Sequence, residues 1–358
     1  MATITGKEMT RSGLLQKTGN MGQLCFADRI ILNQGKASGM RAIDLNTGGG
    51  LTMRILEDRA LDIFHLCYKG INLGFVTKPG LVSPNLYDPS GTEFLRTFQG
   101  GFLYTCGLSN VGPACEDTNG FNPFHGRIGN TPAETVKTDQ YWKDDDYIIE
   151  VSGETREAAL YGENLVLKRK ISAMLGSKEF IIEDEVENQG FESRQVMLMY
   201  HMNMGYPLLD SSTKLYLPAS GTEARSTAES GGIDDYGSFG DPVDGKEEQA
   251  LYHYLKGDSG GNTGICIYNH GNSIGVSFKY NLKELPCLTQ WKSMKTGDYV
   301  VGIEPGNCHP DGRKSSREKG ESDMIQAGES RKYSIRFSII DGVKELDDFI
   351  SEFDFFIC

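Results

Sequence analysis

An imidazole and a carboxylate stand at the ends of two strand-like runs. His201 follows the run 195–200, and period-two alternation puts it on one face with Asn203. Glu304 ends a second apolar run and is followed at once by a Pro-Gly pair. A histidine exchanges protons near neutral pH, and a carboxylate can act beside it in acid–base chemistry. The alternatives are a histidine with a local structural partner and a glutamate paired with a surface lysine.

A turn with a second histidine adds further polar groups. His125 precedes Gly126, which allows a tight turn, and Arg127 follows. Two more arginines, Arg59 and Arg96, lie among apolar residues. A structural ion pair is the alternative to a ligand contact for each of these arginines.

No metal site is expected. The spacing Glu304-x-x-x-Cys308-His309 lacks a third ligand at usable distance. The eight cysteines are scattered and include no Cys-x-x-Cys pair. Reduced thiols in a cytoplasmic protein are the simplest interpretation.

The bulk charge limits the classes of partner. The net charge of −13 argues against nucleic acid, whose binding depends on Lys and Arg contacts to phosphate. It argues equally against an acidic membrane surface. No apolar run approaches the length of a transmembrane helix, and residues 1–20 contain no apolar signal core. We expect a small-molecule partner, with a homodimer left open.

The elements that must position these groups are nearly all strands. Alternating segments recur along the chain, as at 147–151, 180–186 and 331–339. No alternation of strands with helices is present, which argues against a parallel sheet. The predicted class is all-β, with a large antiparallel β-sandwich of two packed sheets.

Helices are expected only near the two ends of the chain. Residues 1–20 are predicted to form a helical segment, with the helix over 7–18, and a second short helix is predicted over 344–355. Residues 218–248 are rich in Gly, Ser, Asp and Glu and are predicted to be a mobile loop or insertion. The whole chain, 1–358, is expected to form one β-sandwich domain.

Five stretches in chain order resemble the galactose mutarotase-like superfamily. The resemblance is closer to a branch of aldose-1-epimerase-family proteins without an assigned function. The stretches are 57–63 (EDRALDI), 96–108 (RTFQGGFLYTCGL), 124–130 (FHGRIGN), 200–209 (YHMNMGYPLL) and 288–307 (LTQWKSMKTGDYVVGIEPGN). The resemblance implies a β-sandwich with a sugar cleft on one sheet.

The resemblance also implies roles for individual residues. In mutarotases a strand-end His protonates the sugar ring oxygen, and a Glu in a motif like VGIEPG takes the proton of the anomeric hydroxyl. The matching positions are His201 as acid and Glu304 as base. His125 matches a His that contacts sugar hydroxyls. Arg127 replaces a Gly of that motif and would favour an acidic or phosphorylated sugar.

The remaining substrate contacts match the superfamily less directly. The motif that carries the mutarotase sugar-binding Arg is absent, so Arg96 is the nearest candidate and Arg59 the next. Asn203 is included because it shares the face of His201. The mutarotase Asp that binds the sugar has no clear match, and Asp210 and Asp244 are the nearest positions.

The implied activity is interconversion of the α and β anomers of a sugar or acidic sugar derivative, without a cofactor or metal. A non-catalytic carbohydrate-binding protein and another sugar isomerase on the same scaffold stay open, because one fold hosts many activities. A standard glycosidase would need a second carboxylate beside Glu304. Trp291 is expected in the core, with a sugar-stacking platform as the alternative.

Overall fold

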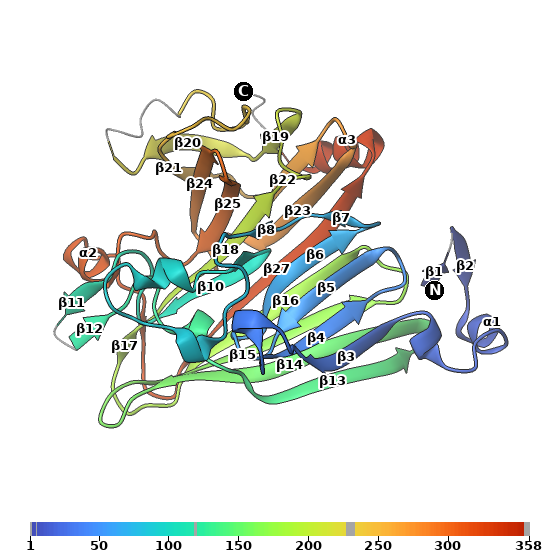
Figure 1. Ribbon diagram of the computed structural model, residues 1–358, viewed down its shortest axis with the longest axis horizontal. Helices are drawn as coiled ribbons and strands as arrows, with labels where there is room; N and C mark the ends of the chain where they lie inside the picture. The colour runs from blue at the N-terminus through green and yellow to red at the C-terminus, as the bar shows by residue number, and fades with distance from the viewer. Residues whose placement is uncertain (1, 5, 118–119, 227–232, 354–358) are drawn as a thin grey trace.

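The computed structural model describes residues 2–4, 6–117, 120–226 and 233–353. Three larger sheets make up most of the molecule (Figure 1). Neighbouring strands in all three run antiparallel. The predicted all-β class and antiparallel β-sandwich are confirmed, with three larger sheets in place of the two expected.

Each of these sheets has a defined strand order from one edge to the other. The eight-stranded sheet runs through β13 (Glu134–Lys143), β14 (Asp146–Ala158), β15 (Asn164–Met174), β16 (Glu179–Asn188), β27 (Ser330–Asp341), β23 (Ile274–Asn281), β22 (Asn262–Asn269) and β19 (Thr213–Tyr216). The six-stranded sheet runs through β10 (Leu103–Leu108), β18 (Met197–Gly205), β25 (Asp298–Gly306), β24 (Cys287–Lys295), β21 (Gln249–Leu255) and β20 (Ala219–Ala224). The five-stranded sheet runs through β3 (Phe26–Ile31), β4 (Arg41–Asn46), β5 (Leu51–Leu56), β6 (Asp62–Tyr68) and β7 (Ile71–Asn72).

The remaining elements are short. The two-stranded pairs are β1 (Ala2–Ile4) with β2 (Lys7–Met9), β8 (Phe75–Val76) with β9 (Gly100–Gly101), β11 (Cys115–Asp117) with β12 (Gly120–Asn122), and β17 (Arg194–Gln195) with β26 (Met324–Ile325). The α-helices are α1 (Arg11–Leu15), α2 (Arg313–Glu318) and α3 (Val343–Glu352). The 3₁₀ turns are η1 (Met21–Gln23), η2 (Gly35–Ala37), η3 (Pro84–Leu86), η4 (Glu93–Arg96) and η5 (Ile128–Asn130).

The two expected terminal helices are present, but the N-terminal one is shorter than the predicted 7–18. Thr10 caps α1, because its side chain accepts a hydrogen bond from the Gly13 backbone N–H (3.2 Å). The residues before this cap pair as strand β2 with β1 instead of extending the helix.

The predicted loop 218–248 is also corrected in part. Its first residues form β20, the edge strand of the six-stranded sheet, which pairs with β21. Farther along, Tyr236 and Phe239 are buried. Residues 227–232 lie outside the described residues. The polar composition therefore concealed a strand and two packed aromatic side chains.

One hydrophobic core runs through all three sheets. It includes Ile43 of β4, Val151 of β14 and Leu198 of β18. This continuity supports the proposal of a single domain over 1–358. On β18 the predicted alternation is confirmed, because Leu198 and Tyr200 belong to this core whereas Met199 belongs to a second cluster.

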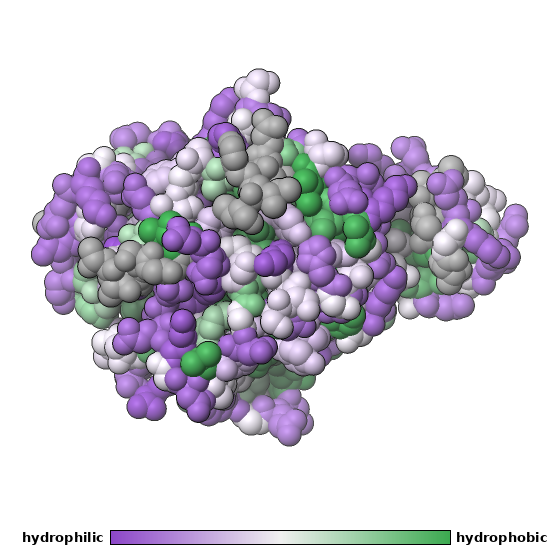
Figure 2. Space-filling view, turned by 90° about the horizontal axis from the view of Figure 1, so that it is seen from above, coloured by the Kyte–Doolittle hydropathy of each residue, from purple (hydrophilic) through white to green (hydrophobic). Residues whose placement is uncertain are grey.

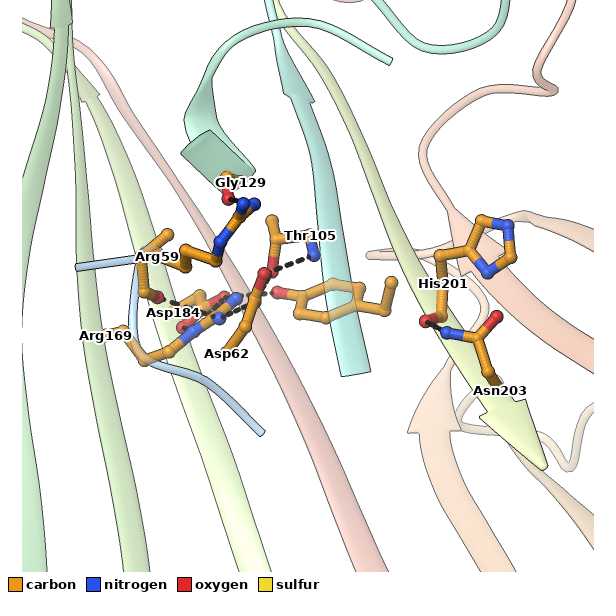
Figure 3. A network of polar contacts seen from close by, with 10 residues as sticks. Arg59, Asp62, Thr105, Gly129, Arg169, Asp184, His201 and Asn203 are labelled. Atoms are coloured by element: carbon orange, nitrogen blue, oxygen red, sulfur yellow. Dashed lines mark hydrogen bonds and ion pairs between the residues drawn. The ribbon is translucent and has the colours of Figure 1, made fainter. Parts of the chain in front are cut away.

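A buried ionic cluster joins the sheets next to β18. Arg169 of β15 donates hydrogen bonds to Asp184 of β16 (2.7 Å) and Asp62 of β6 (2.9 Å). The Tyr200 hydroxyl donates to Asp184 (2.8 Å), and Thr105 of β10 donates to Asp62 through both its hydroxyl and its backbone N–H. Figure 3 shows this cluster beside β18 and His201 farther to the right. Successive residues of β18 thus point into the core and toward the opposite face.

Hydrophilic residues cover most of the face seen in Figure 2, and hydrophobic ones form small separate groups there. The apolar side chains of the strands are instead buried between the sheets. Within the described ranges, no helix combines the length and apolar character needed to cross a membrane.

Candidate active site

The sheet register brings His201 and Glu304 side by side. Strands β18 and β25 are neighbours, and Asn203 lies directly opposite Gly302. Counting two residues back along β18 and two forward along β25 places Glu304 opposite His201. The distance from His201 Nε2 to Glu304 Oε1 is 3.2 Å. Two residues about a hundred positions apart thus form one polar pair.

The same row continues across the sheet on both sides of this pair. Tyr104 of β10 lies opposite His201, and Thr289 of β24 lies opposite Glu304. Side chains in one row of a sheet share a face. The six-stranded sheet therefore presents a line of hydroxyl, imidazole and carboxyl groups on the face away from the main core.

A cleft of about 430 Å³ opens over this row. Its aromatic lining residues are Phe94, Phe98, Phe124 and Trp291. Its polar lining residues are His125, His201, Arg225, Glu248, Thr289, Glu304 and Asp311. A mainly apolar wall with a few convergent polar groups is typical of a small-molecule site.

A larger hollow of about 730 Å³ lies over the eight-stranded sheet. Its lining is mostly charged, and several of its lysines are engaged in ion pairs, such as Lys170 with Glu183 (2.6 Å). The smaller cleft is the better candidate site, because it alone of the two contains the His201–Glu304 pair.

Aromatic rings surround the His201 imidazole. Ring centroids lie 5.5 Å away for Trp291, 5.6 Å for Phe98 and 5.8 Å for His125. This burial lowers the pKa of His201 to about 4, while the Asn203 side chain acts in the opposite direction. His201 is therefore neutral at pH 7.

Burial has the opposite effect on the neighbouring carboxyl group. It raises the pKa of Glu304 to about 8. The negative charge of Glu248 also raises this pKa, whereas the positive charge of Arg225 lowers it. Glu304 consequently carries a proton at pH 7, and the pair holds one proton more than a neutral imidazole beside a carboxylate. This additional proton is the shared proton of the pair. Within the described residues, neither Glu304 Oε1 nor His201 Nδ1 completes a hydrogen bond.

His125 reaches the cleft from a strained turn. Its φ is +56°, and its Nδ1 accepts a hydrogen bond from the Gly112 backbone N–H (3.2 Å). The neutral imidazole therefore carries its proton on Nε2, the nitrogen left to donate to a ligand. Burial lowers the pKa of His125 well below its usual value, so it stays neutral. A Cβ on Gly126 would lie 2.0 Å from the Gly107 carbonyl oxygen, so this turn requires glycine.

Trp291 lies at the cleft and not in the core as expected. Its indole N–H donates to Glu248 Oε2 (2.8 Å), which fixes the ring as part of the wall. Glu248, Arg225 and Asp311 were not identified from the sequence. They flank β20, β21 and β25, and only the sheet order brings these segments together. Alternation along 288–292 puts Thr289 and Trp291 on one face of their strand. This pattern could have indicated from the sequence that both side chains line the cleft.

Arg59 is placed away from the cleft, which corrects its prediction as a substrate contact. The side chain is completely buried. Its guanidinium donates to the carbonyl oxygens of Val82, Thr97 and Gly129 and to Asn130 Oδ1. These five hydrogen bonds occupy the N–H groups of the Arg59 guanidinium, so the side chain links the surrounding loops and does not contact a ligand in the cleft.

The other two arginines are also outside the cleft. Arg96 is largely exposed and pairs with Glu93 in the same 3₁₀ turn (2.9 Å), while its neighbour Leu95 lines the cleft. Arg127 donates to the Phe121 carbonyl oxygen (2.8 Å) and lines a separate pocket. The predicted preference for acidic sugars through Arg127 therefore loses its geometric basis.

Asn203 lies beneath His201 and does not line the cleft. It is fully buried, and its Nδ2 donates to the His201 carbonyl oxygen (3.0 Å; Figure 3). Asp210 and Asp244 do not line the cleft either. In the described ranges, no three His, Cys, Asp or Glu side chains form a cluster suited to a metal ion.

Comparison with protein families assigns the chain. The model of a domain of unknown function, DUF4432, matches residues 37–339. The chain belongs to the DUF4432 family. No curated protein matches the sequence of this DUF4432 protein.

Solved structures with the same fold include galactose mutarotase-like proteins and aldose 1-epimerases. A candidate aldose 1-epimerase from Klebsiella pneumoniae is 21% identical, with a TM-score of 0.87 over 93% of this chain and 89% of that one. A galactose mutarotase-like protein from Clostridium acetobutylicum is 17% identical, with a TM-score of 0.63 over 89% and 99%. A galactose 1-epimerase from Lactobacillus acidophilus is 13% identical, with a TM-score of 0.56 over 89% and 99%. At these identities the likeness establishes the fold alone.

Proposed function

We propose that this DUF4432 protein is an isomerase of the aldose 1-epimerase type, which interconverts the α and β anomers of a sugar. The observation that carries the proposal is the His201–Glu304 pair, 3.2 Å apart and buried at the cleft. Both members titrate far from their usual pKa values and line a cleft of suitable chemistry. The shared fold with an enzyme named galactose 1-epimerase adds support.

Anomer exchange needs two proton movements at one carbon. A base removes the proton of the O1 hydroxyl and an acid protonates the ring oxygen, so that the C1–O5 bond breaks and an open-chain aldehyde forms. Rotation about C1–C2 and closure by the reverse steps give the other anomer. A pair that holds one shared proton suffices, because the proton taken from O1 replaces the one given to O5.

The proton of the pair is assigned to Glu304 in the unliganded protein. The sequence-based roles, His201 as acid and Glu304 as base, describe the ion-pair form instead. The two forms contain the same number of protons and interconvert by transfer across the 3.2 Å contact. They are one titrating unit, and either form can begin the reaction.

The rest of the cleft would hold the sugar. Trp291 and Phe98 offer apolar faces for its C–H groups. His125 donates from Nε2, while Glu248 and Asp311 accept hydrogen bonds from hydroxyl groups. Arg225 contributes a positive charge to this lining. Any preference for acidic sugars would therefore depend on Arg225 and not on Arg127.

The pH dependence follows from the shifted pKa values. The pair keeps its single shared proton between about pH 4, below which His201 is protonated as well, and about pH 8, above which Glu304 is ionised. We expect kcat/KM for anomer exchange to be level between these limits and to fall outside them. If His201 and Glu304 had ordinary pKa values, kcat/KM would instead show a narrower maximum near pH 5–6. A decline that begins near pH 6.5 would contradict the shifts.

The first test is anomer exchange measured by NMR saturation transfer. The panel contains aldoses, uronic acids, sulfonated sugars and sugar phosphates. We expect acceleration with at least one sugar and its loss in His201→Ala. Saturable binding without acceleration would replace the proposal by a carbohydrate-binding protein. Transfer of label from C1 to C2 would indicate another sugar isomerase.

A further inference from the structure

Gly302 occupies the position where a side chain would separate the catalytic pair. A Cβ built on Gly302 would lie 2.5 Å from Glu304 Oε1, 3.2 Å from Trp291 Cβ and 3.3 Å from His201 Cε1. Its φ is not in the left-handed region, so backbone conformation does not require glycine at this position. The absence of a side chain leaves the space that the Glu304 carboxyl group occupies.

Asn203, directly opposite Gly302, fixes a second feature of the pair. Its amide orientation follows from chemistry, because the group that donates to the His201 carbonyl oxygen (3.0 Å) must be the NH₂. The other end of the amide is therefore the oxygen, which only accepts. Figure 3 shows this oxygen on the side of the His201 ring. Among the described residues, Asn203 Oδ1 and His201 Nδ1 are both buried and neither completes a hydrogen bond. The Asn203 side chain nevertheless acts on the imidazole as a hydrogen-bond partner that raises the pKa of His201.

The two facing atoms determine where the imidazole carries its proton. An amide oxygen beside Nδ1 favours a proton on Nδ1, since two acceptors would repel each other. Nε2 then presents its lone pair to Glu304 Oε1, 3.2 Å away. The complementary partner for that lone pair is a protonated carboxyl group.

We propose that the cross-strand pair Asn203–Gly302 positions the catalytic pair. Asn203 holds His201 as the Nδ1–H tautomer, and Gly302 leaves the space in which the Glu304 carboxyl group meets Nε2. The expected effect on the rate of anomer exchange rests on the proposed function, whereas the expected tautomer of His201 does not. Both are positioning residues, because neither lines the cleft.

The tautomer is measured directly in the wild-type protein. Two-bond ¹H–¹⁵N correlation spectra of ¹⁵N-histidine-labelled protein at pH 7, with His201 assigned by its absence in His201→Ala, distinguish a proton on Nδ1 from one on Nε2. We expect the Nδ1–H form. Asn203→Ala should give a mixture of the two tautomers, and Asn203→Asp, which retains an acceptor oxygen, should restore Nδ1–H. An Nε2–H wild type, or an unchanged tautomer in Asn203→Ala, overturns the role of Asn203.

The space at Gly302 is tested by Gly302→Ala. The clashing Glu304 oxygen is the far end of a flexible side chain, so the carboxyl group should move while the fold persists. We expect kcat to fall about 10²-fold with little change in KM, because misplacement of a catalytic group by about 1 Å has that size of effect. The ¹⁵N shifts of His201 should change as well. Gly221→Ala on β20 is the matched control, since its Cβ would make only an ordinary 3.5 Å contact with Tyr254.

The two readouts separate the possible failures. Full kcat and unchanged ¹⁵N shifts in Gly302→Ala overturn the role of Gly302. If the wild-type protein exchanges no anomers, the proposed function fails, and the ¹⁵N spectra alone still decide whether Asn203 and Gly302 set the geometry of the pair.

Discussion

Glu304→Gln is expected to lower kcat/KM for anomer exchange by about 10²–10⁴-fold, the contribution of one positioned acid–base group. Glutamine preserves the shape of the side chain but cannot give or take the proton that the pair shares. The change should appear in kcat, because the amide can still contact a bound sugar. NMR saturation transfer with the preferred sugar measures it.

Stability gives an independent check on the same variant. Because burial raises the pKa of Glu304 above its ordinary 4.5, the folded state binds the extra proton and its stability falls as pH rises from 4.5 to about 8. Glutamine does not titrate, so Glu304→Gln avoids this loss of stability at high pH. The variant should unfold at a higher temperature than the wild-type protein near pH 8 and at a similar temperature near pH 4. Glu223→Gln, on exposed β20 surface, is the control for activity. Retained exchange in Glu304→Gln would show that Glu304 is not the proton carrier.

Arg169→Met is expected to lower the free energy of unfolding by about 3–5 kcal/mol, the typical result of removing one partner from a buried ion pair. Asp62 and Asp184 would both remain buried without their shared cation. Methionine fills much of the volume, so lost charge compensation dominates the effect. Urea unfolding at pH 7 measures the difference.

A neighbouring exposed pair provides the matched comparison. Arg336 of β27 lies 3.4 Å from Glu179, and both side chains are about half exposed. Arg336→Met should cost less than about 1 kcal/mol, because water screens the exposed pair. Equal costs for the two variants would show that the buried cluster contributes no special stability. The cluster matters for the site because Tyr200, bonded to Asp184, immediately precedes His201.

The local sequence pattern was sufficient to predict which side chains of strand β18 face the core and which face the site. Alternation over 195–203 separates residues such as Tyr200, which enters the core, from His201 and Asn203 on the other face. The predicted strand ends were wrong, because β18 continues past His201 to Gly205 and β25 continues past Glu304 to Gly306. The face on which each residue lies was predicted correctly. The reason is physical: successive side chains of a strand point to opposite faces, so face membership is a local property.

The functions of the arginines depended on contacts that no local pattern contains. Arg59, Arg96 and Arg127 each lie near apolar or turn residues in the sequence, yet their donors face loop carbonyls or a nearby acid. Arg225, in a polar segment predicted to be a loop, lines the cleft. A long flexible side chain can reach in many directions, and its partner is set by which distant segments fold beside it.

The sequence by itself determined the all-β class, the faces of the strands and the presence of two residue types that can exchange protons. Tertiary structure alone decided that His201 and Glu304 lie 3.2 Å apart, because strand order and register join positions far apart in the chain. It also decided where their shared proton resides, since burial among Phe98, His125 and Trp291 is a property of packing.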